Sequence, residues 1–320
     1  AHQIHQQTNS RTDLRGLYPN GSSALNLAFF SGHSWASRAW LFNAGIRLNS
    51  FVIHIPDLEF GESSIAPLAL VGNVGALYPL QDRHHLGFSF QSGFRAPSVN
   101  DLSTFGPFDS GIEVPTSSLN PEKSYTFDIS YRYLSKKFQW QSALFYTSLQ
   151  DLITRVPATY QGKDTYDGDP VFAKANTAKA YLYGFESDWN GMLTATLDLG
   201  GSLTYLFGQD ISADAPMRRI PPLNGTAWLG WTPVQHLKLV LEYWAADAQT
   251  RLAAGDISDH RIPEGGTPGW QVINFRVNYQ LGSFRLNAGM QNIGDQLYRT
   301  HGSGVDGYGR SYWATFSYHW

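Results

Sequence analysis

The sequence of 320 residues contains no cysteine, and only 15% of its residues are charged. The absence of cysteine excludes a disulfide scaffold and cysteine-ligated zinc or iron–sulfur sites. Ordinary soluble domains carry roughly 25% charged residues, so the charge deficit is large. Aromatic residues nevertheless reach 14%, which excludes an intrinsically disordered chain. The net charge of −3 gives no electrostatic reason to expect a nucleic-acid partner.

Long hydrophobic runs are missing as well. The best of them, such as Ala66–Val71, is about six residues long, whereas a membrane-spanning helix needs roughly 18. The polar N-terminal segment AHQIHQQTNS has no features of a secretory signal peptide. We therefore expect either a mature chain or a part of something larger, and we exclude a helical membrane protein.

What the sequence does contain is a period of two. Residues 272–281 (VINFRVNYQL) alternate apolar and polar side chains, which predicts a strand with one apolar and one polar face. The same alternation recurs along the chain. Thirteen strands are predicted, over residues 22–31, 35–51, 67–78, 83–94, 123–134, 138–152, 179–190, 193–207, 223–231, 237–246, 269–280, 283–293 and 309–320.

The lengths of these strands and of their connections indicate the class of fold. Many segments are about ten to fifteen residues long; a tilted strand needs roughly nine to eleven to cross a bilayer, and strands of soluble proteins average roughly five to six. Short connections such as Ser135–Lys137 alternate with long ones such as Arg95–Glu122, as periplasmic turns and extracellular loops do in outer-membrane barrels. We predict an all-β, antiparallel transmembrane β-barrel. A soluble β-sandwich is the weaker alternative, because nearly every strand has one apolar face.

The number of strands suggests that the barrel extends beyond this sequence. Single-chain bacterial barrels have an even number of strands, with both ends in the periplasm. If Gly32–Ser34 is a short periplasmic turn, a count of thirteen places residues 1–21 in an extracellular loop. We therefore expect residues 1–320 to be the C-terminal portion of a transmembrane β-barrel, with 1–21 as a loop remnant and the N-terminal strands missing.

Sequence motifs point to one family of barrels. The chain resembles TonB-dependent outer-membrane receptors, with mild departures at Gly294 and at the terminal Trp320, where family members usually end in phenylalanine. The resemblance covers about residues 90–320 in the family's order. It rests on Gly93–Leu102 (GFRAPSVNDL), residues 120–131 (NPEKSYTFDISY), Tyr181–Trp189 (YLYGFESDW), Arg218–Trp231 (RRIPPLNGTAWLGW) and Gln291–Arg310 (QNIGDQLYRTHGSGVDGYGR).

This resemblance implies a barrel of 22 strands, of which about 12–13 are here, closed by an N-terminal plug domain. It implies a receptor in the outer membrane of a Gram-negative bacterium that imports a scarce nutrient, such as an iron–siderophore, with energy from the TonB complex. The implied partners are outer-membrane lipid, a small-molecule ligand, the TonB complex acting through the plug, and the plug-bearing part as a second chain or missing segment. No cofactor, no metal and no catalytic residue is expected.

Two other functions stay open at this point: a self-contained passive porin and an outer-membrane barrel enzyme. The segment HGSG at 301–304 could suggest a His–Ser pair, but it lacks the G-x-S-x-G pattern of a nucleophile elbow. The number of strands separates the alternatives, because an even number with both ends in the periplasm could close alone.

Candidate site residues follow from their types and places. Aromatic rings with arginines on the long loops suit stacking and anionic groups. Charges on the polar strand faces suit the lumen and a plug. The ligand candidates are Phe105, Phe108, Asp109, Arg155, Tyr160, Tyr166, Arg251, His260, Arg261, His301 and Tyr308, and the plug-facing candidates are Arg95, Arg132, Glu186, Arg276 and Arg285.

Overall fold

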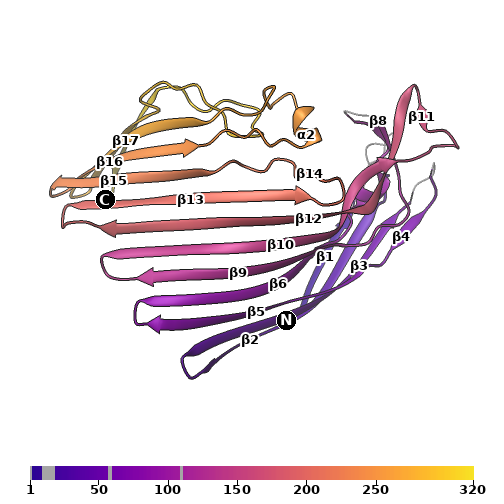
Figure 1. The fold of residues 1–320 in the computed structure, drawn as a ribbon, viewed down its shortest axis with the longest axis horizontal. Coiled ribbons are helices and arrows are strands. Elements are labelled where there is room, and N and C mark those ends of the chain that lie inside the picture. Colours follow the sequence, from indigo (N-terminus) through magenta and orange to yellow (C-terminus); the bar gives the residue numbers. More distant parts are fainter. Residues whose placement is uncertain (1, 9–18, 57–59, 109–110) are drawn as a thin grey trace.

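A computed structural model describes residues 2–8, 19–56, 60–108 and 111–320. Within them, fourteen long strands follow one another in an antiparallel meander, each paired with the next (Figure 1). They are β1 (His2–Thr8), β2 (Ser23–Ser37), β3 (Trp40–Ile55), β5 (Leu68–Gln81), β6 (His84–Arg95), β9 (Glu122–Leu134), β10 (Phe138–Pro157), β12 (Asp169–Met192), β13 (Leu197–Asp210), β15 (Asn224–Val234), β16 (Leu237–Ala246), β17 (Trp270–Leu281), β18 (Phe284–Gln291) and β19 (Ser311–Tyr318).

The sheet is curved and open. Strand β1 pairs with β2, strand β19 pairs with β18, and neither has a second neighbour in the part of the chain that the structure describes. The predicted all-β antiparallel class is therefore confirmed, as one wall of a barrel that this chain does not close. No helix among the described residues is long and apolar enough to span a membrane.

Three details of the prediction were wrong. Residues 2–8, expected in the extracellular loop 1–21, form β1, so the described long strands number fourteen, an even number, and not thirteen. Strand β1 pairs with β2 from Thr8 opposite Ser23 to His2 opposite Phe29; residues 1 and 9–18 of that loop lie outside the described chain. The expected turn at Gly32–Ser34 is extended strand, and the hairpin turns at Arg38–Ala39 instead. Residues 193–196, expected in a strand, form a turn closed by the backbone N–H of Leu193 on the carbonyl of Leu197.

The connections divide between the two ends of the strands. Six turns of two to four residues lie on the left of Figure 1, and the long loops lie on its right. This confirms the predicted alternation of short and long connections. The long loops carry small elements: β4 (Ser63–Ile65), α1 (Val99–Ser103), β7 (Gly106–Phe108), β8 (Gly111–Val114), β11 (Thr165–Tyr166), β14 (Ala215–Pro216) and α2 (Ala254–Ile257).

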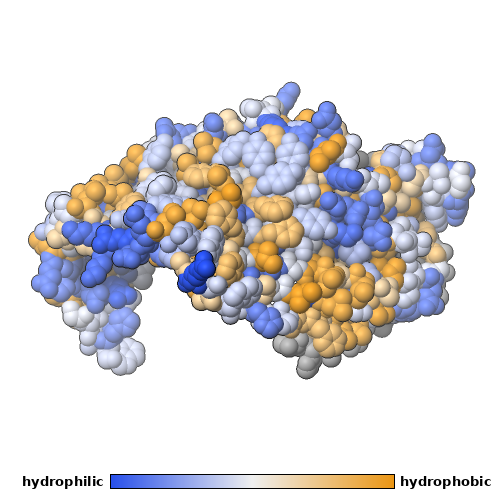
Figure 2. Space-filling view, turned by 60° about the horizontal axis from the view of Figure 1, so that its bottom comes forward, coloured by the Kyte–Doolittle hydropathy of each residue, from blue (hydrophilic) through white to orange (hydrophobic). Residues whose placement is uncertain are grey.

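The pairing register sorts the side chains into two faces. One row across β6, β9, β10 and β12 aligns Phe88, Ile129, Leu144 and Phe185, which is the apolar face expected toward lipid. Hydrophobic side chains accordingly reach the surface in broad patches rather than singly (Figure 2). Another row, on the opposite face, aligns Arg132 with Gln141 and Asp188. This polar face is the inner wall.

The buried apolar core is small and lies under the long loops, not between two sheets. Ile53 and Ile55, at the loop end of β3, pack with Leu102 of α1 and with Leu119. The β6–β9 loop is thus held down on the inner side of the strands by a few buried side chains. Its residues keep a fixed position relative to the neighbouring loops.

The two faces predict opposite responses to charge. Leu144 on the outer face of β10 is 57% exposed, and Leu144→Arg is expected to lower the free energy of unfolding in lipid by about 2–4 kcal/mol, because a guanidinium there enters hydrocarbon. Gln141→Arg, on the inner face of the same strand, is the matched control and is expected to change it little. Denaturant titration of the full receptor in vesicles measures both, and equal effects would contradict the assignment of faces.

Candidate extracellular binding surface

The β6–β9 loop begins with a locally encoded helix cap. In the segment APSVND, the hydroxyl of Ser98 accepts a hydrogen bond from the backbone N–H of Asp101, and the carboxylate of Asp101 accepts one from the backbone N–H of Ser98. This reciprocal arrangement is a capping box. It fixes the five-residue helix α1 directly after β6 and aims the carboxylate of Asp101 at the end of that strand.

Asp101 belongs to a network of six charged side chains at the rim: Arg95, Asp101, Glu113, Glu122, Arg155 and Lys174. Arg95 binds Asp101 at 2.6 Å and both oxygens of Glu122 at 2.5 and 2.9 Å. Lys174 bridges Asp101 at 3.4 Å and Glu113 at 3.1 Å. Arg155 binds Glu113 at 2.5 Å. Three cations meet three carboxylates, so this network is neutral and ties the β6–β9 loop to β10 and β12.

The network also sets the ionisation of Asp101. Burial opposes ionisation of this carboxyl group, but hydrogen bonds from Ser98 and Arg95 together outweigh that effect, and the pKa of Asp101 lies below its ordinary value. Arg95 remains a cation, because its hydrogen bonds to Glu122 and Asp101 outweigh desolvation and raise its pKa. Arg95, predicted to face a plug, thus has its guanidinium in contact with two carboxylates of the rim.

Four aromatic rings from three different loops meet above the network; we name Phe60, Phe105, Tyr160 and Tyr166 the aromatic cluster. The ring centroids of Phe60 and Phe105 are 4.8 Å apart, and those of Tyr160 and Tyr166 are 5.2 Å apart. Phe105 joins the two pairs at 5.6 Å from Tyr160 and 6.0 Å from Tyr166. Three predicted ligand residues are therefore brought together, along with Phe60, which the sequence analysis missed.

The other predicted loop residues lie apart from this cluster. Phe108 packs edge-on against Phe172, and Arg155 lies 4.3 Å above the ring of Phe108. Arg251 lies 4.0 Å from the ring of Phe207 and donates to the carbonyl oxygen of Gly208 at 2.6 Å. Tyr308 is largely exposed, as is His260. Asp109 lies outside the described residues.

A second polar cluster joins the three loops that follow β13, β16 and β18. The carboxylate of Asp259 accepts hydrogen bonds from Arg218, Arg219 and Arg261. His301 lies beside this cluster and shares a hydrogen bond of 2.9 Å with the hydroxyl of Thr267. Desolvation and the charge of Arg219 lower the pKa of His301, although Asp256 and Asp259 act in the opposite direction, so the ring is neutral at pH 7.

The inner wall holds the predicted plug-facing residues. Arg132 and Glu186 line a hollow of about 420 Å³ together with Asp188 and His85. The Nδ1 atom of His85 is buried without a hydrogen-bond partner among the described residues. Farther along the wall, Arg276 pairs with Glu242 on the neighbouring strand, and Arg285 donates to Gln280 at 3.4 Å. These charges are spread along the wall rather than gathered at one centre.

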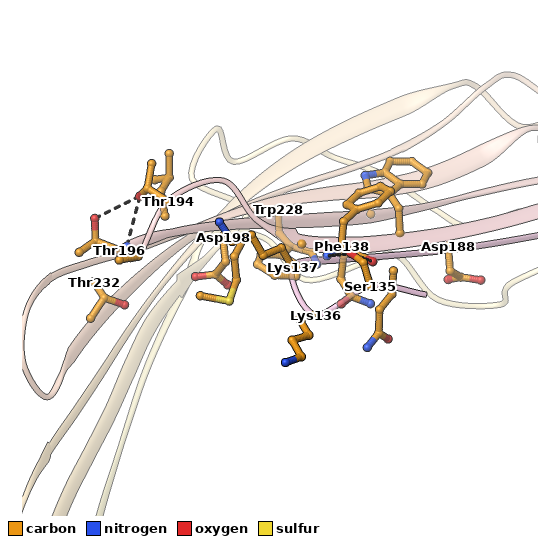
Figure 3. A pocket seen from close by; sticks show the side chains of 18 of the residues that line it. Ser135, Lys136, Lys137, Phe138, Asp188, Thr194, Thr196, Asp198, Trp228 and Thr232 are labelled. Atoms are coloured by element: carbon orange, nitrogen blue, oxygen red, sulfur yellow. Dashed lines mark hydrogen bonds between the residues drawn. The ribbon is translucent and has the colours of Figure 1, made fainter. Parts of the chain in front are cut away.

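A further hollow of about 740 Å³ lies at the opposite end, beside the short turns (Figure 3). Lys136 and Lys137 of the β9–β10 turn line it, and the backbone N–H of Thr196 donates to the hydroxyl of Thr194 in the next turn. Lys238 and Asp198 on its wall form an ion pair of 2.6 Å. This hollow contains none of the predicted ligand residues.

Some residues of the surface were missed although the sequence carries a signal for them. Phe60 is the one aromatic residue of the segment PDLEFGESSIAP, and Arg218 and Arg219 form a doubled arginine before Ile220 and Pro221. Glu113 and Lys174, by contrast, have no distinguishing sequence context. No group of three or more His, Cys, Asp or Glu side chains that could hold a metal ion occurs in the part of the chain that the structure describes.

Comparisons with known proteins agree with this architecture. The family model described as TonB dependent receptor-like, beta-barrel, matches residues 3–293. No curated protein matches the chain. Barrels of this family are outer-membrane proteins of Gram-negative bacteria.

Three solved structures similar to the chain are the copper transporter OprC, the FrpB iron transporter from Neisseria meningitidis (F3-3 variant) and the siderophore receptor PiuA from Acinetobacter baumannii. Their TM-scores are 0.78, 0.75 and 0.71, and their sequence identities are 19%, 14% and 16%. The matches cover 93%, 99% and 93% of this chain but only 48%, 52% and 43% of those chains. The chain therefore spans about half the length of these proteins, and the likeness shows the fold.

The capping carboxylate yields a prediction that depends on pH. Because the pKa of Asp101 is lowered in the folded loop, its contribution is present above its ordinary pKa of 3.8 and is lost as the pH falls through the folded-state value. Asp101→Asn is expected to lower the local opening free energy of residues 98–104 by about 1.5–3 kcal/mol at pH 6, since hydrogen bonds to charged groups contribute about that much.

Hydrogen exchange of the full receptor, corrected for intrinsic rates, measures this opening. The difference between Asp101→Asn and the unsubstituted protein is expected to shrink at pH 3. Asp164→Asn, an exposed carboxylate on the β10–β12 loop, is the control and is expected to have no effect. A difference as large at pH 3 as at pH 6 would contradict the role given to the charge of Asp101.

Proposed function

Because this chain belongs to the TonB-dependent receptor-like β-barrel family, we propose that it is the C-terminal wall of an outer-membrane active-transport receptor. This receptor binds a scarce nutrient, an iron–siderophore or a similar compound, at its long loops. It imports the nutrient with energy delivered by the TonB complex through a plug domain that lies outside this sequence. The similar structures are transporters of copper and iron and a receptor for siderophores, which agrees with uptake as the general function.

The observation that carries this proposal is the aromatic cluster above a polar inner wall. Four rings from three loops converge at the one end of the sheet where all the long connections lie. Flat aromatic faces stack on planar ligands such as catecholates. The inner face of β9 continues from the rim through Thr126 and Asp128 to Arg132, which lines a hollow with Glu186 and Asp188 near the short turns. A ligand bound at the rim would therefore meet a polar wall along its path inward.

The open edges support a partner for this wall. In lipid, backbone N–H and C=O groups have no water to bind, so a spanning sheet must close on itself. Strands β1 and β19 each have one neighbour among the described residues. Further strands, on a second chain or on another part of the same polypeptide, would complete the barrel. A self-contained porin would instead need β1 to pair with β19.

The charges of the inner wall support a plug as the content of the lumen. Arg132, Glu186 and Asp188 with His85 surround one hollow, whereas Arg276 is paired with Glu242 and Arg285 contacts Gln280. A polar domain filling the lumen would find exposed donors and acceptors there.

Uptake by living cells tests the proposal. Radioactive iron bound to a catecholate siderophore serves as the probe in cells that contain the full receptor as their sole iron receptor. Uptake is expected to need both the receptor and TonB. The double substitution Phe105→Ala with Tyr160→Ala is expected to raise the siderophore concentration at half-maximal uptake about tenfold, because each aromatic contact contributes about 0.5–1.5 kcal/mol.

Tyr312→Ala is the matched control. It removes a tyrosine that is 72% exposed near the start of β19, outside the long loops, and whose ring contacts none of the aromatic cluster among the described residues. It is expected to leave the siderophore concentration at half-maximal uptake within about twofold of the value for the unsubstituted receptor. Uptake that persists without TonB would replace the proposal with a passive porin.

A further inference from the structure

The second polar cluster of the loops carries an excess of positive charge. We name Arg218, Arg219 and Arg261, gathered around Asp259, the arginine cluster. Arg218 and Arg219 follow β14, and Asp259 and Arg261 follow α2 on another loop. We propose that the arginine cluster binds an oxyanion of phosphate or carboxylate type. This inference rests on the proposed function, since it names a ligand class for the same extracellular surface.

One oxygen atom holds the three arginines together. Oδ2 of Asp259 accepts from Nη2 of Arg218 at 3.1 Å, from Nη2 of Arg219 at 3.0 Å and from Nη2 of Arg261 at 2.6 Å. Nε of Arg261 also donates to Oδ1 at 2.7 Å. The carboxylate of Asp259 is itself 3% exposed, so the three guanidinium groups surround a buried anion.

The nearby carboxylates do not balance these cations. Asp256 lies 3.7 Å from Nε of Arg218, but its oxygens already accept hydrogen bonds from the backbone N–H groups of Arg219 and Ala253. Two carboxylates thus face three arginines, which leaves one excess positive charge. His301 beside them is neutral at pH 7 because burial and Arg219 lower its pKa.

Other charged groups near the cluster do not change this balance. Arg299 of the neighbouring loop forms its own ion pair with Asp306 at 2.6 Å and also donates to the carbonyl oxygen of Arg261. The rim network around Glu113, by contrast, matches three cations with three carboxylates. The excess is therefore a property of the arginine cluster and not of the loops in general.

The arginines keep donors for a ligand. A guanidinium carries five N–H groups, yet the side chains of Arg218 and Arg219 each donate one hydrogen bond among the described residues, and that of Arg261 donates two. Their side chains are 50%, 44% and 35% exposed. The fork of N–H groups matches the spacing of two oxygens on a phosphate or carboxylate. An oxyanion can thus bind the solvent side of the cluster and offset its charge.

The surrounding backbone holds these side chains in place. Arg219 has a left-handed backbone with a φ of 58°, and its N–H donates to both oxygens of Asp256. The HGSG segment lies beside the stems of two arginines. A Cβ built on Gly302 would lie 3.6 Å from Cγ and Cδ of Arg219, and one on Gly304 would lie 3.4 Å from Cδ of Arg261. The cluster is therefore preorganised before any ligand arrives.

Binding of a simple anion to the full receptor tests the site. Calorimetric titration with inorganic pyrophosphate, in low salt and in lipid-free detergent, gives the affinity. Arg219→Gln is expected to weaken binding at least about tenfold, since charge-assisted hydrogen bonds contribute about 1.5–3 kcal/mol. Arg261→Lys retains the charge but loses the fork and is expected to have an intermediate effect. Heat-modifiable migration on gels verifies that each variant is folded.

Lys163→Gln is the control, because Lys163 is an exposed loop cation outside the arginine cluster; it is expected to leave the affinity unchanged. A second titration uses nanodiscs with and without phosphorylated lipid A. If pyrophosphate binds in both kinds of nanodisc and this binding depends on the arginines, the natural ligand is soluble. If pyrophosphate fails to bind only in the nanodiscs that contain lipid A, the lipid headgroup already occupies the site and is its natural ligand. Equal affinities for Arg219→Gln and Lys163→Gln would overturn the site.

The anion site and the proposed uptake function can be refuted independently of each other. Pyrophosphate binding needs neither TonB nor transport, so a receptor that binds the anion but shows no TonB-dependent uptake would retain the site and lose the uptake proposal. If the unsubstituted receptor shows TonB-dependent uptake but Arg219→Gln binds pyrophosphate as tightly as the unsubstituted receptor, the uptake proposal stands and the anion site is lost.

Discussion

The hydrogen-bond ladder between neighbouring strands is the constraint on which the rest of this structure depends. A wall that spans lipid has no water to satisfy its backbone, so each strand must pair along its whole length inside the membrane. Antiparallel hairpins are the simplest continuous solution, and they place every second connection at the same end. Where the ladder ends, the connecting segments are no longer bound by this pairing and can take up the irregular conformations of loops. The aromatic cluster and the arginine cluster lie there on the long connections, and the rim network joins one of these connections to the adjoining ends of the strands.

The ladder also explains which parts of the fold could be predicted. Each of the thirteen predicted segments overlaps a long strand of the structure, because a period of two survives wherever one face meets lipid. The errors arose where that signal is ambiguous. Gly32 suggests a turn, yet glycine fits an extended strand whose outer row continues to Trp35. Leu193 and Ala195 imitate alternation within a turn, and the polar sequence HQIHQQT of β1 shows too little alternation to stand out.

The binding surface was less predictable for a different reason. Residue type and loop position identified Phe105, Tyr160 and Tyr166 as ligand candidates, but not that they meet Phe60 from a third loop. Arg155 looked free for an anion, whereas Glu113, nearly buried, neutralises it. Arg261 looked like one isolated cation, whereas Asp259 gathers two more arginines beside it. Such partners lie on different segments of the chain. Whether they come into contact depends on how the strands are arranged across the sheet, which the sequence around each residue does not reveal.

The hairpin of β10 and β12 is much taller than the membrane it crosses. Strand β12 has 24 residues, and at roughly 3.3 Å per residue its path is about 80 Å long, far more than a bilayer requires. Its upper part is held by paired backbone groups from Pro157 opposite Phe172 downward. Backbone pairing is indifferent to most side chains, so the tip around β11 can change its sequence while the wall below stays intact. Proteins that share this wall can therefore differ in the part of the hairpin that stands farthest from the membrane.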